Sequence, residues 1–212
     1  MPEIVNPRIE AYLRDLYRDG DAVREEMEAL ALERRFPIVG PLVGRHLEVL
    51  ARAISARRVF ELGSGYGYSA LFFARAVGER GEVHCTDLDE QNVRQGQAFL
   101  QRAGLAGRIT YHREEATAAL RRVGGVFDIV YNDIDKEGYP ETVELAHAHL
   151  RPGGLFISDN VLRHGRVLEG EDDGTPATHG IREFTRLLFA HPGFLTCIDP
   201  TRDGLAVAVR LD

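Results

Sequence analysis

Three oxygen-bearing side chains follow two short apolar runs that are spaced like neighbouring strands of a sheet. Asp133 comes after the run 127–131, and Asp159 and Asn160 come after the run 155–158. Carboxylate and amide oxygens are the ligands that hard divalent cations such as Mg²⁺ prefer. Without a cation, two close carboxylates repel and one of them stays protonated. The pattern predicts a Mg²⁺-type site formed by these three side chains, in preference to separate helix caps or turn residues.

A glycine-rich loop offers a second kind of binding chemistry. Residues 61–69 read Glu-Leu-Gly-Ser-Gly-Tyr-Gly-Tyr-Ser and join a predicted strand to a predicted helix. Glycines permit a tight turn and a close approach of ligand to backbone, and the N–H groups at the start of a helix suit an anion or a carboxylate. The glycines here are evenly spaced, whereas the dinucleotide fingerprint has a wider second gap. The spacing therefore disfavours an NAD-dependent oxidoreductase.

An acidic residue, Asp87, ends the next predicted strand, 82–86. An acid at this place can accept hydrogen bonds from both ribose hydroxyls of an adenosine. The alternative is that Asp87 caps the following helix, but Asp89 is the better candidate for that cap. The order of strand, glycine loop, helix, strand and acid predicts that Asp87 binds the ribose of a cofactor.

These residues require a scaffold in which strands and helices alternate. Strands are predicted at 58–62, 82–86, 108–112, 127–131, 155–158, 194–198 and 205–210. Helices are predicted at 42–55, 69–77, 90–103, 116–123, 141–150 and 181–190, after two polar helices within 7–35. Such alternation forms βαβ units and a parallel sheet with helices on both faces. The last two strands are predicted to form a hairpin.

This pattern predicts one α/β domain over residues 1–212, with an N-terminal helical cap at 1–40 and a core at 41–212. We expect a doubly wound, Rossmann-like, mostly parallel seven-stranded sheet with an antiparallel C-terminal hairpin strand. Ligands of such sheets bind outside the carboxyl ends of the strands. The polar residues that end the strands should therefore line one crevice: Asp87, Asp133, Asp159 and Asn160.

Composition limits the classes of function. The formal net charge of −7 argues against nonspecific binding of nucleic acid, which needs a basic face. No apolar run approaches the ~18 residues of a membrane span, and the N-terminus shows no basic region followed by an apolar run. We therefore expect a cytoplasmic protein. Cys85 and Cys197 both lie in predicted strands and are expected to be buried, reduced thiols.

The motifs resemble those of class I methyltransferases, whose glycine loop has the pattern Glu-x-Gly-x-Gly-x-Gly. More narrowly, they resemble the cation-dependent O-methyltransferases, which include catechol O-methyltransferase and the caffeoyl-CoA O-methyltransferases. Asp133-Ile134-Asp135-Lys136 and the segment 151–162, Arg-Pro-Gly-Gly-Leu-Phe-Ile-Ser-Asp-Asn-Val-Leu, carry this narrower likeness. The likeness extends over roughly residues 36–211.

The resemblance implies a divalent-cation-assisted O-methyltransferase that uses S-adenosylmethionine and a small catechol-like acceptor. It implies that Lys136 is the general base and that Asp133, Asp159 and Asn160 bind the cation. It places cofactor contacts at Val39, Glu61, Gly63, Gly65, Gly67, Ser69, Asp87, Glu115, Ala116 and Asp133. Together with the helices before residue 36, it also implies a homodimer.

Two positions depart from the family pattern. Arg163 stands where many members carry a Trp that walls the aromatic substrate, and Asn132 replaces an apolar residue. A cationic wall would favour an acidic or phosphorylated acceptor, whereas an Arg163 side chain in solvent would have no such effect. The alternative functions are a cofactor-binding domain with a non-catechol acceptor or without catalysis, and a nucleic-acid methyltransferase. The net charge disfavours the last of these.

Overall fold

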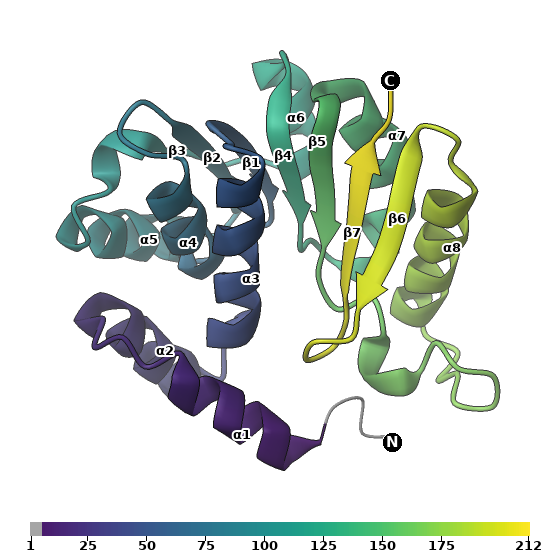
Figure 1. Ribbon diagram of the computed structural model, residues 1–212, viewed down its shortest axis with the longest axis horizontal. Helices are drawn as coiled ribbons and strands as arrows, with labels where there is room; N and C mark the ends of the chain where they lie inside the picture. The colour runs from purple at the N-terminus through teal and green to yellow at the C-terminus, as the bar shows by residue number, and fades with distance from the viewer. Residues whose placement is uncertain (1–5) are drawn as a thin grey trace.

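The computed structural model describes residues 6–212, which form a twisted sheet between two layers of helices (Figure 1). The strands are β1 (Arg58–Leu62), β2 (Glu82–Thr86), β3 (Ile109–His112), β4 (Phe127–Asn132), β5 (Leu150–Ser158), β6 (Phe194–Asp199) and β7 (Leu205–Arg210). The helices are α1 (Pro7–Leu16), α2 (Ala22–Arg34), α3 (Gly40–Ala53), α4 (Tyr68–Ala76), α5 (Glu90–Arg102), α6 (Ala116–Val123), α7 (Tyr139–His149) and α8 (Pro176–Ala190). Short 3₁₀ turns are η1 (Ala106–Arg108), η2 (Lys136–Gly138) and η3 (Arg163–Gly165).

The strand order is β3-β2-β1-β4-β5-β7-β6. The first five strands pair in parallel, and β7 pairs antiparallel with both β5 and β6. This confirms the prediction of a mostly parallel seven-stranded sheet with an antiparallel strand from the C-terminal hairpin. The chain order reverses between β1 and β4, which is where a doubly wound sheet opens a crevice at its carboxyl ends.

Each face of the sheet packs on its own apolar core. Val59 of β1 belongs to the core formed with α2, α3, α4 and α5, and the next residue, Phe60, belongs to the core formed with α6, α7 and α8. Successive side chains of a strand point to opposite faces, so the two cores hold the strand from both sides. The loops that follow β1, β2, β4 and β5 therefore project from a rigid platform.

The elements differ from the predicted ones mainly at their ends. Helix α8 begins five residues earlier than expected, because the Thr175 side chain accepts a hydrogen bond from the Thr178 N–H and Pro176 fits the first helical turn. Strand β5 begins at Leu150, before the Pro-Gly-Gly segment that we expected only to end the preceding helix. The pairing of β5 with β4 shifts register there. The first five residues of the predicted N-terminal cap lie outside the described residues.

The prediction of two buried thiols is wrong for one of them. Cys85 is buried in β2, but Cys197 is exposed. Cys197 lies in the edge strand β6, two residues after Leu195, which is 66% exposed. Residues two apart share a face of a strand, so both side chains point away from the covered side of the sheet. No helix within residues 6–212 has the length and apolarity needed to cross a membrane.

Candidate active site

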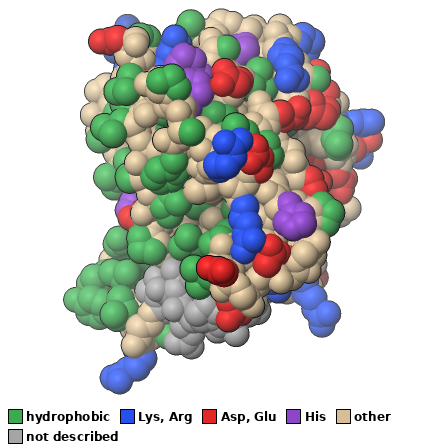
Figure 2. All heavy atoms as spheres, turned by 90° about the vertical axis from the view of Figure 1, so that its right-hand side faces the viewer, with side chains coloured by type: hydrophobic (Ala, Val, Ile, Leu, Met, Phe, Trp, Pro, Cys, Tyr) green, Lys and Arg blue, Asp and Glu red, His purple; other side chains and the backbone are tan. Residues whose placement is uncertain are grey.

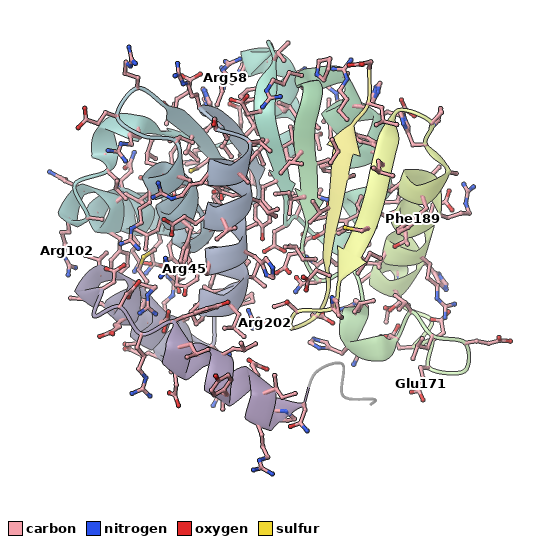
Figure 3. All side chains as sticks on the ribbon, in the orientation of Figure 1. Arg45, Arg58, Arg102, Glu171, Phe189 and Arg202 are labelled. Carbon is pink, nitrogen blue, oxygen red and sulfur yellow. The ribbon has the colours of Figure 1, made fainter. Side chains whose placement is uncertain are left out.

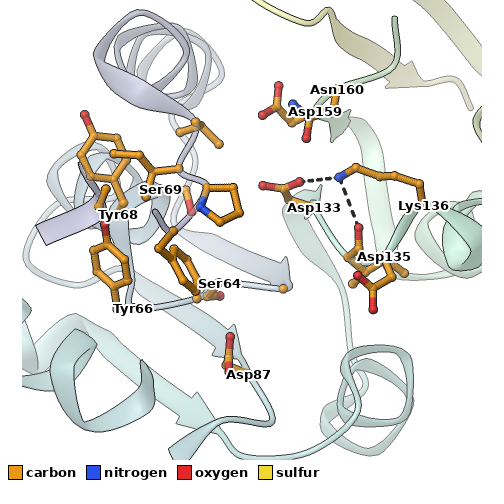
Figure 4. Close-up of a pocket in the computed structure, with 18 of the residues that line it drawn as sticks. Ser64, Tyr66, Tyr68, Ser69, Asp87, Asp133, Asp135, Lys136, Asp159 and Asn160 are labelled. Carbon is orange, nitrogen blue, oxygen red and sulfur yellow. Dashed lines mark hydrogen bonds and ion pairs between the residues drawn. The ribbon is translucent and has the colours of Figure 1, made fainter. Parts of the chain in front are cut away.

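One large pocket opens at the carboxyl ends of the parallel strands (Figure 4). Its volume of about 1360 Å³ exceeds that of a typical site for one small ligand, roughly 300–1,000 Å³, and leaves room for a cofactor and an acceptor. The residues predicted from sequence that line it are Val39, Gly63, Gly65, Ser69, Asp87, Glu115, Ala116, Asp133, Lys136, Asp159 and Asn160. The prediction that the acidic strand ends and Asn160 share one crevice is confirmed.

The loop after β1 needs glycine for both conformation and space. Gly63 and Gly67 have φ of +83° and +82°, which L side chains rarely adopt. A Cβ on Gly63 would lie 2.8 Å from the backbone oxygen of Asp133, and one on Gly67 would lie 2.6 Å from the hydroxyl of Tyr111. Thr86 fixes the loop from below, because its Oγ1 accepts from the Gly63 N–H at 2.9 Å. The loop is thus shaped by its own contacts.

Two predicted cofactor contacts lie outside the pocket lining. Glu61 is fully buried beneath the loop, with the Cys85 thiol 3.6 Å from its Oε2. Burial raises the pKa of Glu61 to about 7, although the hydroxyls of Ser64 and Ser69 oppose the shift. Gly67 begins α4 and packs against Tyr111 instead of facing the pocket. Both residues therefore support the loop from behind, and their predicted contacts with a cofactor stay a prediction.

The acidic residue after β2 faces the pocket, as Figure 4 shows. One oxygen of Asp87 accepts from the backbone N–H of Asp89 at 2.7 Å and from the amide of Asn92 at 3.3 Å. Asp89, and not Asp87, caps α5 through the N–H of Gln91. The helix cap is therefore supplied by another residue, and the Asp87 carboxylate is held in place at the pocket wall.

Glu115 also combines lining with a structural contact. It caps α6 by accepting from the N–H groups of Thr117 and Ala118, at 2.9 and 2.7 Å. Burial opposes ionisation, but these backbone hydrogen bonds, a further one from the Thr117 hydroxyl and the charge of Arg121 together lower the pKa of Glu115. Its neighbour Ala116, the first residue of α6, lines the same part of the pocket.

The acidic pair lies where β4 and β5 end. Asn132 of β4 pairs with Ser158 of β5, so Asp133 and Asp159 follow matched positions of adjacent parallel strands. Asp159 is only 2% exposed, and its Oδ1 has no hydrogen-bond partner among residues 6–212. Burial, together with the charge of Asp133, raises the pKa of Asp159 to about 7. Burial also raises the pKa of Asp133, despite a neighbouring lysine.

Lys136 points at this pair (Figure 4). Its Nζ lies 2.7 Å from Asp133 Oδ1 and donates to the hydroxyl of Tyr139 at 2.8 Å and to the oxygen of Ile134 at 3.2 Å. Three such bonds use every donor of an ammonium group. The Tyr139 hydroxyl in turn donates to the backbone oxygen of Asp159 at 2.9 Å. Sequence analysis missed Tyr139, which joins the lysine to the strand that carries Asp159.

The oxygen donors fit a hard divalent cation. No cluster of three or more His, Cys, Asp and Glu side chains suited to a metal ion occurs among residues 6–212. The set here has two carboxylates and one amide, Asp133, Asp159 and Asn160, which all line the pocket. A buried carboxylate oxygen without a partner is costly, and a cation would compensate both it and the repulsion within the pair. These residues could therefore hold Mg²⁺ or a similar ion.

The segment that carries Val39, predicted to contact the cofactor, is tethered by a residue that the sequence did not single out. Arg202, in the β6–β7 loop, donates to the backbone oxygen of Ile38 at 2.9 Å and also to that of Val39. Figure 3 places Arg202 between that loop and the end of α3 where the chain enters the helix. Phe36, at the other end of the segment, packs on Tyr66 of the glycine loop with ring centroids 5.1 Å apart. No local sequence signal connects residues so far apart in the chain.

Fold and site together define the chain as a methyltransferase of the Rossmann-like class. A glycine loop follows β1, an acidic residue follows β2, and the pocket spans the carboxyl ends of the parallel strands. The family model described as O-methyltransferase matches residues 24–211. The chain therefore belongs to this O-methyltransferase family.

Individual relatives agree with this assignment. A catechol O-methyltransferase from Niastella koreensis is 33% identical over 218 residues, covering 95% of this chain and 96% of that protein. A catechol O-methyltransferase from Mycobacterium tuberculosis is 34% identical over 151 residues, covering 71% of this chain and 68% of that protein. Among solved structures, an O-methyltransferase from Bacillus cereus in complex with SAH superposes with a TM-score of 0.85 at 28% identity, over 96% of this chain and 97% of that one.

Proposed function

We propose that this O-methyltransferase transfers the methyl group of S-adenosylmethionine to one hydroxyl of a small catechol-like acceptor, assisted by a divalent cation. The observation that carries the proposal is the partnerless oxygen of the buried Asp159, beside Asp133 and Lys136, in a pocket large enough for two ligands. The names of the catechol O-methyltransferase relatives support the acceptor class.

The cofactor belongs at the glycine-loop end of the pocket. The turn at Gly63 and Gly65 lets a ligand approach the backbone, and the start of α4 supplies N–H groups for its carboxylate. Asp87 is placed to accept hydrogen bonds from the ribose hydroxyls. Val39, in the segment that Arg202 holds, covers the same ligand. S-adenosylmethionine, whose product form SAH is bound by the Bacillus cereus relative, meets each of these requirements.

The acceptor belongs at the end formed by Asp133, Asp159 and Asn160. A divalent cation held by these oxygens would lower the pKa of a bound hydroxyl and orient it. Lys136 accepts the hydroxyl proton once it has left its ion pair with Asp133 and lost a proton of its own. The acceptor oxygen then forms a bond to the methyl carbon as the sulfur–methyl bond breaks, and the neutral thioether SAH remains. The pocket contributes by aligning the two reactants.

Turnover of a plain catechol tests this proposal. The purified protein with S-adenosylmethionine, Mg²⁺ and catechol should yield a monomethyl ether and SAH in equal amounts, measured by mass spectrometry and chromatography. Asp159→Asn removes the charge that the cation needs and keeps the side-chain shape, so it should lose this activity while it still binds SAH. Methylation of a single phenol at the same rate as catechol would contradict the role of a vicinal hydroxyl pair.

We further propose that the chain forms a homodimer. Large apolar side chains are exposed on the helical segment before residue 36 and on the sheet edge, among them Tyr12 and Leu16 of α1 and Leu195 of β6. Figure 2, which views the β6–α8 side, shows hydrophobic side chains gathered over one half of this face and charged ones over the other. Symmetric dimers are the commonest oligomers. Light scattering should give twice the mass of the chain at micromolar protein, and a monomer mass there would exclude the dimer.

A further inference from the structure

The turn that follows the acidic pair has a strained backbone. Three of its non-glycine residues, Asn160, Arg163 and His164, have φ of 59°, 52° and 54°. Each such residue costs free energy, and strain of this kind persists only where the surrounding structure enforces it, often at functional sites. The turn directly follows β5, so the strain lies at the rim of the acceptor end of the pocket.

The β6–β7 loop enforces this conformation. The N–H groups of Val161 and Leu162 donate to the backbone oxygens of Gly204 and Asp203, at 3.1 and 2.9 Å. The buried Asp203 carboxylate accepts from the backbone N–H of His164 as well. The turn is therefore fixed on both sides of Arg163. A side chain that is positioned before ligand binding loses less entropy when the ligand arrives.

The Arg163 side chain lines the pocket, and one of its buried N–H groups has no acceptor among the described residues. This group is the Nε–H of the guanidinium. The neighbouring ion pairs do not include it, since Arg166 pairs with Asp173 at 3.0 Å and His164 lies 3.6 Å from Asp203. A buried donor without a partner in a native structure calls for an acceptor that the protein itself does not supply.

We propose that Arg163 is a specificity-determining residue that binds a carboxylate on the acceptor, so that the preferred substrate is an acidic catechol. This inference rests on the proposed function and names its substrate class. A guanidinium presents parallel N–H donors that match the two oxygens of a carboxylate. Arg163 lies three residues beyond Asn160 on one rigid turn. An acceptor whose hydroxyls lie at Asp133, Asp159 and Asn160 would therefore present its ring substituent toward this turn.

Other charged side chains of the pocket would favour the opposite kind of acceptor. Asp135, Glu137 and Glu141 also line the pocket and would favour a cationic acceptor, such as a catechol with an amine. These three carboxylates are exposed, and water screens them more strongly than a buried donor. The buried carboxylate of Asp203, which also lines the pocket, already accepts from the backbone N–H of His164. The buried group of this turn that still lacks a partner among the described residues is therefore the cationic guanidinium of Arg163.

Three acceptors with one catechol ring separate these alternatives. Calorimetric titration of the SAH-loaded protein with Mg²⁺ present should use 3,4-dihydroxybenzoate, its neutral amide and 3,4-dihydroxybenzylamine. The benzoate should bind about 10- to 100-fold more tightly than the amide, the scale of a charge-assisted hydrogen-bonded pair, and the benzylamine should bind least well. All three acceptors carry the same pair of hydroxyls, so the ratio of two of their affinities reports only the contribution of the ring substituent.

Variants assign the preference to one residue. Arg163→Gln should bring the affinities for benzoate and amide close together, while Arg166→Gln, on the same turn but paired with Asp173, should leave their ratio unchanged. Arg163→Lys should retain part of the preference, because it keeps the charge and loses the paired donors. Equal affinity for benzoate and amide in the wild type, tighter binding of the amine, or an unchanged ratio in Arg163→Gln would overturn the inference. Failure to bind or methylate any of the three would instead contradict the proposed function.

Discussion

The two ends of the pocket differ in how far the protein satisfies its own polar groups. At the glycine-loop end, the N–H groups of Gly63 and Ser64 donate to Thr86, and Asp87 accepts from Asp89 and Asn92. At the acidic end, burial raises the pKa values of two adjacent carboxylates, and an oxygen of Asp159 has no hydrogen-bond partner in the part of the chain that the structure describes. Oε1 of Glu61 beneath the glycine loop also lacks a partner among residues 6–212, but it belongs to a single carboxyl whose protonated form burial favours. The acidic end holds two adjacent carboxylates and needs additional positive charge.

This contrast implies that the two ends are separable. A cofactor should bind to the glycine-loop end whether or not the acidic pair is compensated, because none of the hydrogen bonds that the structure describes for residues 63–69 involves Asp159 or Asn160. Productive methyl transfer should depend on both ends. A substitution at one end should therefore leave ligand binding at the other end unchanged.

The largest effect is expected from Lys136→Ala at the acidic end. Loss of a general base typically slows a reaction by ~10²–10⁴-fold, so kcat should fall by this factor while the affinity for SAH stays the same. Steady-state kinetics and calorimetry measure the two quantities. Lys136→Arg is the matched variant, since it keeps a cation beside Asp133 but cannot deprotonate. Near-wild-type turnover of Lys136→Arg would show that only the ion pair matters.

A smaller effect is expected from Asp87→Ala at the glycine-loop end. Lost hydrogen bonds to a charged group should weaken SAH binding by about 1.5–3 kcal/mol, or roughly 10- to 150-fold. The concentration of Mg²⁺ needed for half-maximal turnover should not change. Thr175→Ala serves as the control, because loss of the α8 cap, which lies outside the pocket lining, should cost about 1 kcal/mol of stability and leave affinity unchanged. Equal loss of affinity in both variants would remove Asp87 from its proposed role.

The smallest effect on function is expected from Glu61→Gln, which instead changes the pH dependence of stability. The folded pKa of Glu61 is raised from 4.5 to about 7, so its protonated form favours folding. This contribution is present below pH 4.5 and is lost as pH rises to about 7, by at most about 3 kcal/mol. Urea unfolding between pH 4 and 8 should show that the wild type loses stability relative to Glu61→Gln over this window. Parallel profiles would place the pKa of Glu61 near its usual value.

Local patterns made most of the fold predictable. The observed boundaries of β1, β2 and α6 agree with the predicted ones. Short apolar runs define the two strands, and the capping residue Glu115 directly precedes the helix. The even glycine spacing and the strand-end acids likewise located both ends of the pocket. Single-sequence patterns carry this information since strand alternation and turn chemistry are local properties.

The remaining features depend on contacts between distant segments. Arg202 reaches Ile38 across most of the chain length, and Tyr139 connects Lys136 to Asp159 only after β4 and β5 have paired. The exposure of Cys197 follows from the edge position of β6, which a list of apolar runs does not reveal. The alternation of side chains in β1 buries Glu61 beneath the glycine loop, a placement that the glycine motif alone did not indicate.

Removal of divalent ions tests the central claim most directly. Methylation of catechol and calorimetric binding of SAH should be measured on one preparation, first in EDTA and then after addition of excess Mg²⁺. We predict that turnover disappears in EDTA and returns with Mg²⁺, while the affinity for SAH is the same in both conditions. Full turnover in EDTA would contradict the assignment of Asp133, Asp159 and Asn160 as ligands of a catalytically required cation.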